Sequence, residues 1–139
     1  MANKGKYYES QFEEATIELL REAHWQYTLG DDIHRKYTDP LIEEDLRNFL
    51  AVQYKDKNLT TSEMDGIVAN LRNTGGQNDY YALRNAFLLY RDGYDFAYSD
   101  SRDNPFRMEY IDFEHPDHNI FRCVNQFVMG QGRENRRPD

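Results

Sequence analysis

The sequence has few cysteines, few prolines and no long apolar run. Its 139 residues contain one cysteine and four prolines, so a disulfide framework is excluded and a reducing compartment fits. No stretch approaches the roughly 18 apolar residues of a membrane-spanning helix, and the opening MANKGKYYESQFEE lacks the apolar segment of an export signal. We therefore expect a soluble, cytoplasmic chain without a membrane partner.

Basic residues are also in the minority. Lysine and arginine number 17 against 25 aspartates and glutamates, which gives a net charge of -8. Because phosphate binding needs a basic field, the surface as a whole does not suit nucleic acid, although a local basic patch remains open. The chain is instead rich in aromatics, with eleven tyrosines and eight phenylalanines. These offset the low mean hydropathy of -0.96 and favour a single folded domain over residues 1–139.

Local signals predict four helices within residues 1–93. The first runs from Tyr7 to about Tyr27, the second begins at Asp39 with Pro40 in its first turn, and the fourth runs from Asn78 or Asp79 to Gly93. The third begins at Thr60, which forms a capping box with Glu63, and ends before Gly75. In the first helix the apolar arc contains Phe12, Ala15, Leu19, Leu20 and Ala23, with Ile17 at its edge. Glu13 falls inside that arc, where a carboxylate is costly unless something satisfies it.

Residues 94–139 change to a strand pattern. The segments 106–113 and 120–128 are short and rich in aromatic and β-branched residues, and 114–119 has turn chemistry. We expect these segments to pair as a β-hairpin. Because 120–128 is apolar on both faces, it should be central in a larger sheet, which suggests that the sequence is cut. The expected fold class is α+β, with about four helices followed by a hairpin that starts a truncated sheet.

Several segments together resemble the R subunits of type I restriction-modification enzymes. Ile111-Asp112-Phe113, Val124-Asn125-Gln126-Phe127 and Arg136-Arg137-Pro138-Asp139 are similar to the entry of that family's nuclease domain. The segment YYESQFEEATIELL is similar to its opening helix, with Glu9 and Glu13 at the acidic positions. Residues 39–93 carry no recognised motif of the family.

The resemblance implies a PD-(D/E)xK nuclease fold that hydrolyses DNA with Mg²⁺. Asp139 matches the motif's first acid and would be a catalytic metal ligand, while the Glu-x-Lys pair is expected beyond it. Glu13 is a second candidate ligand, but a partly exposed glutamate at the edge of the stripe is an equal alternative. Carboxylates suit this hard cation, which polarises phosphate and generates hydroxide. Glu9 and Glu14 are weaker candidates.

The resemblance further implies that this chain is part of a longer R subunit. That subunit is expected to use ATP in motor domains and to bind DNA together with methyltransferase and specificity subunits. This chain has no GxxxxGK[ST] motif, so we expect it neither to hydrolyse ATP nor to cleave DNA alone. Arg133, Arg136 and Arg137 are candidates for phosphate contacts, with a solubilising tail as the alternative.

Other interpretations of the sequence remain open. His115 and His118, which flank Pro116 without a third ligand in the motif, fit a turn better than a metal pair, and His24 fits packing or helix capping. Residues 39–93 could dock the subunit to its methyltransferase partner. An acidic mimic of DNA is a third hypothesis, and a homodimer through an exposed hairpin edge is also expected.

Overall fold

The computed structural model describes residues 8–75, 78–131 and 134–136, and the chain forms two compact units. Unit 1 contains residues 1–39 and 120–139, and unit 2 contains residues 40–119. Whether they fold as the one domain that the length suggests stays a prediction. Among the described residues, none of the helices combines the length and the apolar character needed to cross a membrane.

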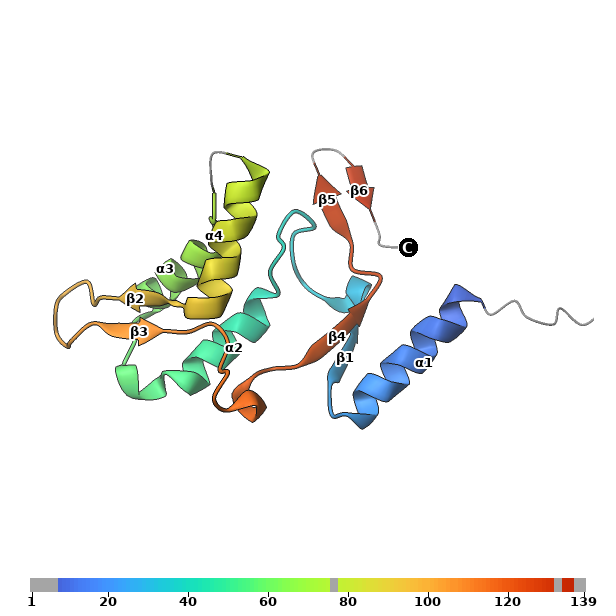
Figure 1. Ribbon diagram of the computed structural model, residues 1–139, viewed down its shortest axis with the longest axis horizontal. Coiled ribbons are helices and arrows are strands. Elements are labelled where there is room, and N and C mark those ends of the chain that lie inside the picture. The colour runs from blue at the N-terminus through green and yellow to red at the C-terminus, as the bar shows by residue number, and fades with distance from the viewer. Residues whose placement is uncertain (1–7, 76–77, 132–133, 137–139) are drawn as a thin grey trace, which may run out of the picture. The chain divides into compact units, whose positions relative to one another are not determined.

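Unit 1 is built on two parallel strands from distant parts of the sequence. After helix α1 (Glu9–Glu22), strand β1 (Gln26–Leu29) pairs with β4 (Arg122–Asn125), and α1 packs against both strands (Figure 1). The 3₁₀ turn η1 (Gly30–Asp32) follows β1, and the hairpin β5 (Met129–Gln131) and β6 (Glu134–Arg136) follows β4. Gly30 lies so close to β4's end that a Cβ there would be 2.2 Å from the Gln126 carbonyl oxygen. Only glycine allows the chain to leave β1 along this path.

Helix α1 ends in a Schellman motif centred on His24. The residue has a φ of 67°, its N–H donates to the Arg21 carbonyl, and the Trp25 N–H donates to the Leu20 carbonyl at 2.9 Å. This pair of bonds satisfies carbonyls that would otherwise be left at the helix end. The expected capping role of His24 is thus confirmed. The helix stops at Glu22 rather than near Tyr27, because residues 26–29 enter the sheet.

Unit 2 contains three helices and a β-hairpin. The helices are α2 (Glu43–Gln53), α3 (Thr61–Arg72) and α4 (Asp79–Asp92), with the 3₁₀ turn η2 (Lys55–Lys57) after α2. Strands β2 (Tyr94–Phe96) and β3 (Phe106–Met108) pair antiparallel, and a last 3₁₀ turn, η3 (Pro116–His118), follows. The buried apolar residues of this unit come from α2, α3, the hairpin with its loop, and the residues just after β3: Phe49, Leu50, Ile67, Val68, Leu71, Phe96, Tyr98, Met108 and Tyr110. The core therefore joins α2 and α3 to the hairpin, without a buried residue from α4.

Two buried tyrosines carry their hydroxyls into this core and hydrogen-bond to the backbone. Tyr98 donates to the Lys57 carbonyl at 2.7 Å, and Tyr110 donates to the Ile67 carbonyl at 2.9 Å. Tyr54 and Tyr98 both have their rings against Phe106. The aromatic residues thus supply both apolar area and satisfied polar groups, which explains how a chain of low hydropathy builds a core.

The predicted capping box at the start of α3 is confirmed. Thr60 Oγ1 accepts from the Glu63 N–H at 3.1 Å, and the Glu63 carboxylate accepts from the Thr60 N–H at 3.0 Å. Glu63 is buried, and Arg102 donates to both of its oxygens, each at 2.7 Å. The hydrogen bonds from Arg102 are the main reason that the pKa of Glu63 falls from 4.5 to about 2. A carboxylate in the helical cap therefore also fixes the loop that follows β2.

The α+β class and the four helices are confirmed, but the expected strand pairing and the expected start of the second helix are wrong. The segments around 106–113 and 120–128 do not form a hairpin with each other, since β3 pairs with β2 and β4 pairs with β1. Helix α2 begins at Glu43 and not at Asp39. The Asp39 carbonyl, which would have to accept the first helical bond, accepts instead from the Arg35 guanidinium at 2.7 Å. Arg35 also donates to the Val128 carbonyl, which ties residues 33–39 to the segment after β4 within unit 1.

Replacement of His24 by glycine should stabilise the chain by about 1 kcal/mol. A left-handed conformation costs a residue with a Cβ roughly 1–2 kcal/mol, and glycine escapes that penalty. Urea unfolding followed by circular dichroism measures the change. His24→Ala is the matched control and should give no gain, because alanine keeps the Cβ. Equal stabilisation by alanine would contradict the left-handed cap.

The stability contributed by Glu63 should depend on pH in the acidic range. Its pKa is about 2 in the folded chain and 4.5 when unperturbed, so the contribution is complete above pH 4.5 and disappears as the pH falls towards 2. Urea midpoints of the unchanged chain and of Glu63→Gln should therefore converge over this interval. A difference that stays constant from pH 7 to pH 2.5 would show that the carboxylate charge is not what stabilises the loop.

Candidate functional site

A groove of about 410 Å³ lies in unit 1 between α1 and β4. Its walls are side chains of one face of α1 together with β4 and the residues that follow it: Glu9, Phe12, Glu13, Thr16, Ile17, Leu20 and Cys123, Val124, Asn125, Gln126, Phe127. Most of these residues are apolar or weakly polar, and the acidic residues of the groove are Glu9 and Glu13. This composition matches an open site in which a few polar groups are placed against an apolar wall.

The face of α1 that lines the groove differs from the arc expected from the sequence. The half-buried positions of this face are Glu13, Ile17 and Leu20, which lie three or four residues apart along the helix. In contrast, Phe12 is 59% exposed and Leu19 is 66% exposed. The reason is that, within the described residues, β1 and β4 form a two-stranded sheet, which covers a narrow stripe of the helix. Ile17, expected at the edge of the apolar arc, is therefore at the centre of the packing face, and Glu13 lies on that same face.

The Glu13 carboxylate is held by a chain of hydrogen bonds that crosses both strands. Asn125 Nδ2 donates to Glu13 Oε1 at 2.5 Å. The Tyr27 hydroxyl donates to Asn125 Oδ1 at 2.9 Å, and this fixes which side of the amide faces the glutamate. Among the described residues no other donor contacts Glu13. The bond from Asn125 thus orients the carboxylate through its Oε1.

Asn125 was not singled out from the residues themselves. It ends β4, paired in register with Leu29 of β1, and so lies at the carboxyl end of both parallel strands. An amide in the mainly apolar segment 120–128 was the available signal, because a half-buried amide needs specific partners.

The other predicted site residues fall mostly outside the described part of the chain. Asp139, Arg133 and Arg137 belong to the residues that the structure does not describe. Arg136 ends strand β6, with its backbone paired to Met129, and its side chain lies outside the description. Of the two acids assigned to the metal, the structure thus positions Glu13, and the role of both stays a prediction.

The two histidines of the 114–119 turn do have a third potential ligand. In unit 2 the Asp112 carboxylate lies beside His115 and His118, and these three side chains could hold a metal ion. The expectation of turn residues is correct for the backbone, since Pro116–His118 forms η3. The third ligand, Asp112, comes from the IDF segment three residues before His115, and so lies outside the turn that the sequence pattern marks.

The comparison with protein families gives a match over almost the whole chain. The model of the family described as type I restriction enzyme R protein N terminus (HSDR_N) matches residues 6–139. No curated protein and no solved structure matches the chain. The match includes α1, both units and the groove between α1 and β4, so the resemblance noted in separate segments extends to the intervening helices. The chain belongs to the family of N-terminal regions of type I restriction enzyme R proteins.

Proposed function

We propose that this chain forms the first part of a Mg²⁺-dependent nuclease domain, within an R subunit that cleaves and translocates DNA with ATP. The observation that carries the proposal is the half-buried carboxylate of Glu13, which lines a groove at the carboxyl end of two parallel strands. Ligands of open α/β sheets typically bind at that end of the strands. Membership in the R-protein family favours this function over a DNA mimic.

The residues present suit Mg²⁺. This ion prefers oxygen ligands, keeps several waters and binds through one or two carboxylates. Glu13 offers one carboxylate beside an open groove that has room for such waters, and Asp139 of the RRPD segment would offer the second. When bound, the ion supplies charge neutralisation at the phosphate and an activated water.

The residues linked to Glu13 by hydrogen bonds would orient rather than react. Asn125 would keep Glu13 in one rotamer, and Tyr27 would keep the Asn125 amide from turning over. Such outer contacts are important in metal sites, where their loss typically weakens metal affinity or activity by about 10–100-fold. Arg133, Arg136 and Arg137 would contact phosphate near the scissile bond, which supplies a local basic patch on an otherwise acidic chain.

In an R subunit assembled with its methyltransferase and specificity subunits, Glu13→Gln should reduce DNA cleavage by at least about 10-fold, the lower end of the effect of disturbing a metal site. Because the motor is separate, DNA-stimulated ATP hydrolysis should be unchanged. Plasmid cleavage over a range of Mg²⁺ concentrations measures the first effect, and phosphate release measures the second.

Glu14→Gln is the matched control, since Glu14 is the exposed neighbour on the other face of α1. Equal cleavage by both variants would remove Glu13 from the site. The chain of residues 1–139 alone lacks an assigned Glu-x-Lys pair and is expected not to nick plasmid DNA. Robust Mg²⁺-dependent cutting by it would contradict the assignment.

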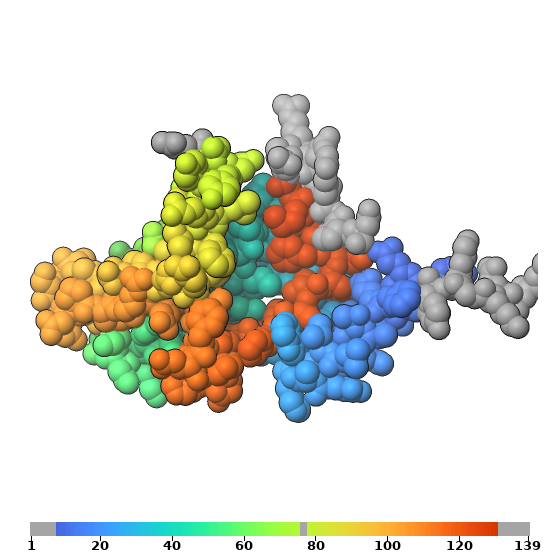
Figure 2. Space-filling view, viewed as in Figure 1, coloured from blue at the N-terminus to red at the C-terminus, as the bar shows by residue number. Residues whose placement is uncertain are grey.

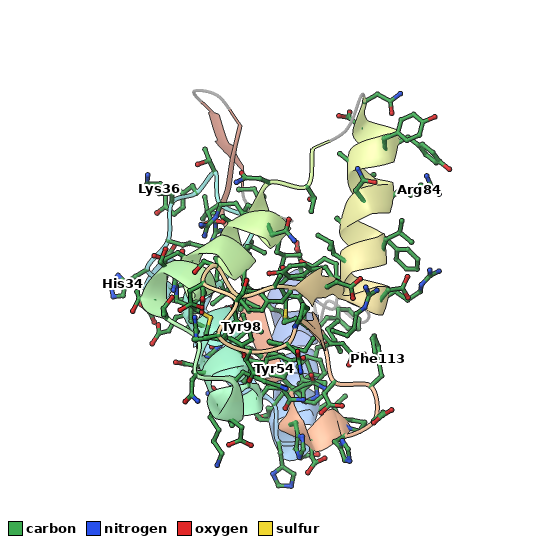
Figure 3. The ribbon with its side chains drawn as sticks, turned by 90° about the vertical axis from the view of Figure 1, so that its left-hand side faces the viewer. His34, Lys36, Tyr54, Arg84, Tyr98 and Phe113 are labelled. Atoms are coloured by element: carbon green, nitrogen blue, oxygen red, sulfur yellow. The ribbon has the colours of Figure 1, made fainter. Side chains whose placement is uncertain are left out.

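A second candidate function is docking to the partner subunits through α4. On one face of this helix Tyr80, Leu83 and Phe87 are 69%, 73% and 60% exposed, and Figure 2 shows the helix (yellow) with these outer turns open to solvent. Arg84 points outward from the same helix (Figure 3). Large exposed apolar faces of this kind are typical of interaction surfaces.

The double change Leu83→Ser and Phe87→Ser should weaken binding of the R subunit to the methyltransferase complex by at least about 10-fold, the effect of losing central apolar anchors. Affinity measured by surface plasmon resonance tests this. Val52→Ser is the control, because Val52 of α2 is 74% exposed and lies off this face. Unchanged affinity of the α4 variant would exclude docking through this helix. Dimerisation through a hairpin edge remains a separate prediction.

A further inference from the structure

The loop at the end of unit 2 gathers one aspartate and two histidines around a single point. Asp112 Oδ2 is 3.1 Å from His118 Nδ1 and 3.6 Å from His115 Nδ1. The side chain of Asp112 is buried, at 7% exposed, whereas the two imidazoles are 49% and 61% exposed. The cluster therefore combines a buried carboxylate with two imidazoles that solutes can reach.

The carboxylate of Asp112 is oriented by the loop's own backbone. Its Oδ1 accepts from the N–H of Glu114 at 3.1 Å and from the N–H of His115 at 2.9 Å. These bonds leave Oδ2 directed at the imidazoles, where Gln53 Nε2 also donates to it at 2.8 Å. Chiefly through the bond from His115 N–H, the pKa of Asp112 is lowered to about 2, so the group is an anion at neutral pH.

The two imidazoles are brought together by the short 3₁₀ turn. His115 precedes η3 and His118 ends it, so the two residues are three positions apart. Residues at that spacing eclipse each other in a 3₁₀ helix. The rings are accordingly stacked, with centroids 4.9 Å apart and planes 17° apart. Pro116 occupies the first position of the turn, where its fixed φ preorganises the backbone.

Asn119 closes the loop and makes it rigid. Its Oδ1 accepts from the Asp112 N–H at 2.9 Å, and its Nδ2 donates to the carbonyls of Asp112 at 2.8 Å and Pro116 at 3.1 Å. Together with Gln53, this residue forms the kind of outer contact that positions metal ligands in proteins. The three side chains are thus held in place without any need for a bound ion to assemble them.

We propose that Asp112, His115 and His118 form a binding site for a Zn²⁺-type transition-metal ion. Metal–ligand bonds of about 2.0–2.1 Å in a tetrahedron place neighbouring ligand atoms roughly 3.3–3.4 Å apart, which is close to both distances from Asp112 Oδ2 to the imidazole nitrogens. Two imidazoles and one carboxylate suit Zn²⁺, Co²⁺ or Ni²⁺, whereas Mg²⁺ and Ca²⁺ prefer oxygen ligands alone. Three protein ligands leave the fourth position to water.

This site is independent of the proposed nuclease centre. It lies in unit 2 and shares no residue with the groove of unit 1, so the failure of either proposal leaves the other intact. The competing explanation is a cluster in which the histidines only hydrogen-bond to Asp112. That cluster would need no metal and would bind none with one-to-one stoichiometry.

Isothermal titration calorimetry of the full chain with Zn²⁺ distinguishes a metal site from a cluster that is only hydrogen-bonded. The protein for this experiment carries no histidine tag. We expect one ion per chain, and a loss of affinity of at least about 10-fold in His115→Asn and in His118→Asn. Co²⁺ should give the intense visible absorption of a tetrahedral site in the unchanged chain only. Both substitutions are at exposed side chains, and circular dichroism confirms that the variants fold.

His34→Asn is the matched control, because His34 is an exposed histidine of unit 1 outside the cluster. It should bind Zn²⁺ like the unchanged chain. The proposal is overturned if the unchanged chain binds no Zn²⁺, if the variants at 115 and 118 bind it as well as the unchanged chain, or if His34→Asn causes an equal loss.

Discussion

The parallel pairing of β1 with β4 is the constraint on which unit 1 depends. It joins Gln26 to Arg122 and Leu29 to Asn125, positions between which the whole of unit 2 lies in the sequence. Parallel strands cannot be linked by a tight turn and need a long crossover, and here residues 40–119 supply it. The pairing also sets the groove, because it places Asn125 of β4 where it can reach both Tyr27 and Glu13.

The chain provides different partners for its acidic side chains, as two buried carboxylates and one half-buried carboxylate show. Glu63 has an arginine and a helix N-terminus, and both neutralise it within the fold. Asp112 has backbone and amide donors on a rigid loop, and its remaining neighbours are imidazoles. Among the described residues, Glu13 has one amide donor. Of these three acids, Glu63 is the one with an arginine partner, so the charges of Asp112 and Glu13 are the ones that the two proposed cations would neutralise.

Local sequence signals predicted the helices well and the strand partners badly. The capping box of Thr60 and Glu63, the cap at Asn78 and the stop at Gly93 all appear in the structure, because each depends on residues within a few positions. The pairing of 106–113 with 120–128 was wrong because a turn between two strands does not decide which strands pair. The start of α2 was also wrong, since Arg35 takes the Asp39 carbonyl, a contact that the local pattern around Pro40 does not reveal.

The same distinction applies to the candidate sites. Glu13 was noticed because it breaks an apolar pattern, but its partner Asn125 lies 112 positions away and is set by tertiary structure. The cluster at Asp112 was missed although its members lie within seven residues, because the geometry of a 3₁₀ turn, and not sequence spacing alone, aligns the imidazoles with the carboxylate.

The two proposed cation sites also differ in a way that bears on how the protein would be regulated by metals. A groove that offers carboxylate oxygen selects hard ions such as Mg²⁺, whereas a site with two imidazoles selects ions late in the first transition series. An ion of the second kind at Asp112 would therefore not substitute for Mg²⁺ at Glu13. It would instead add bonds among residues 112–118 and stabilise unit 2 by mass action. The nuclease chemistry and the stability of the chain would then respond to different metals.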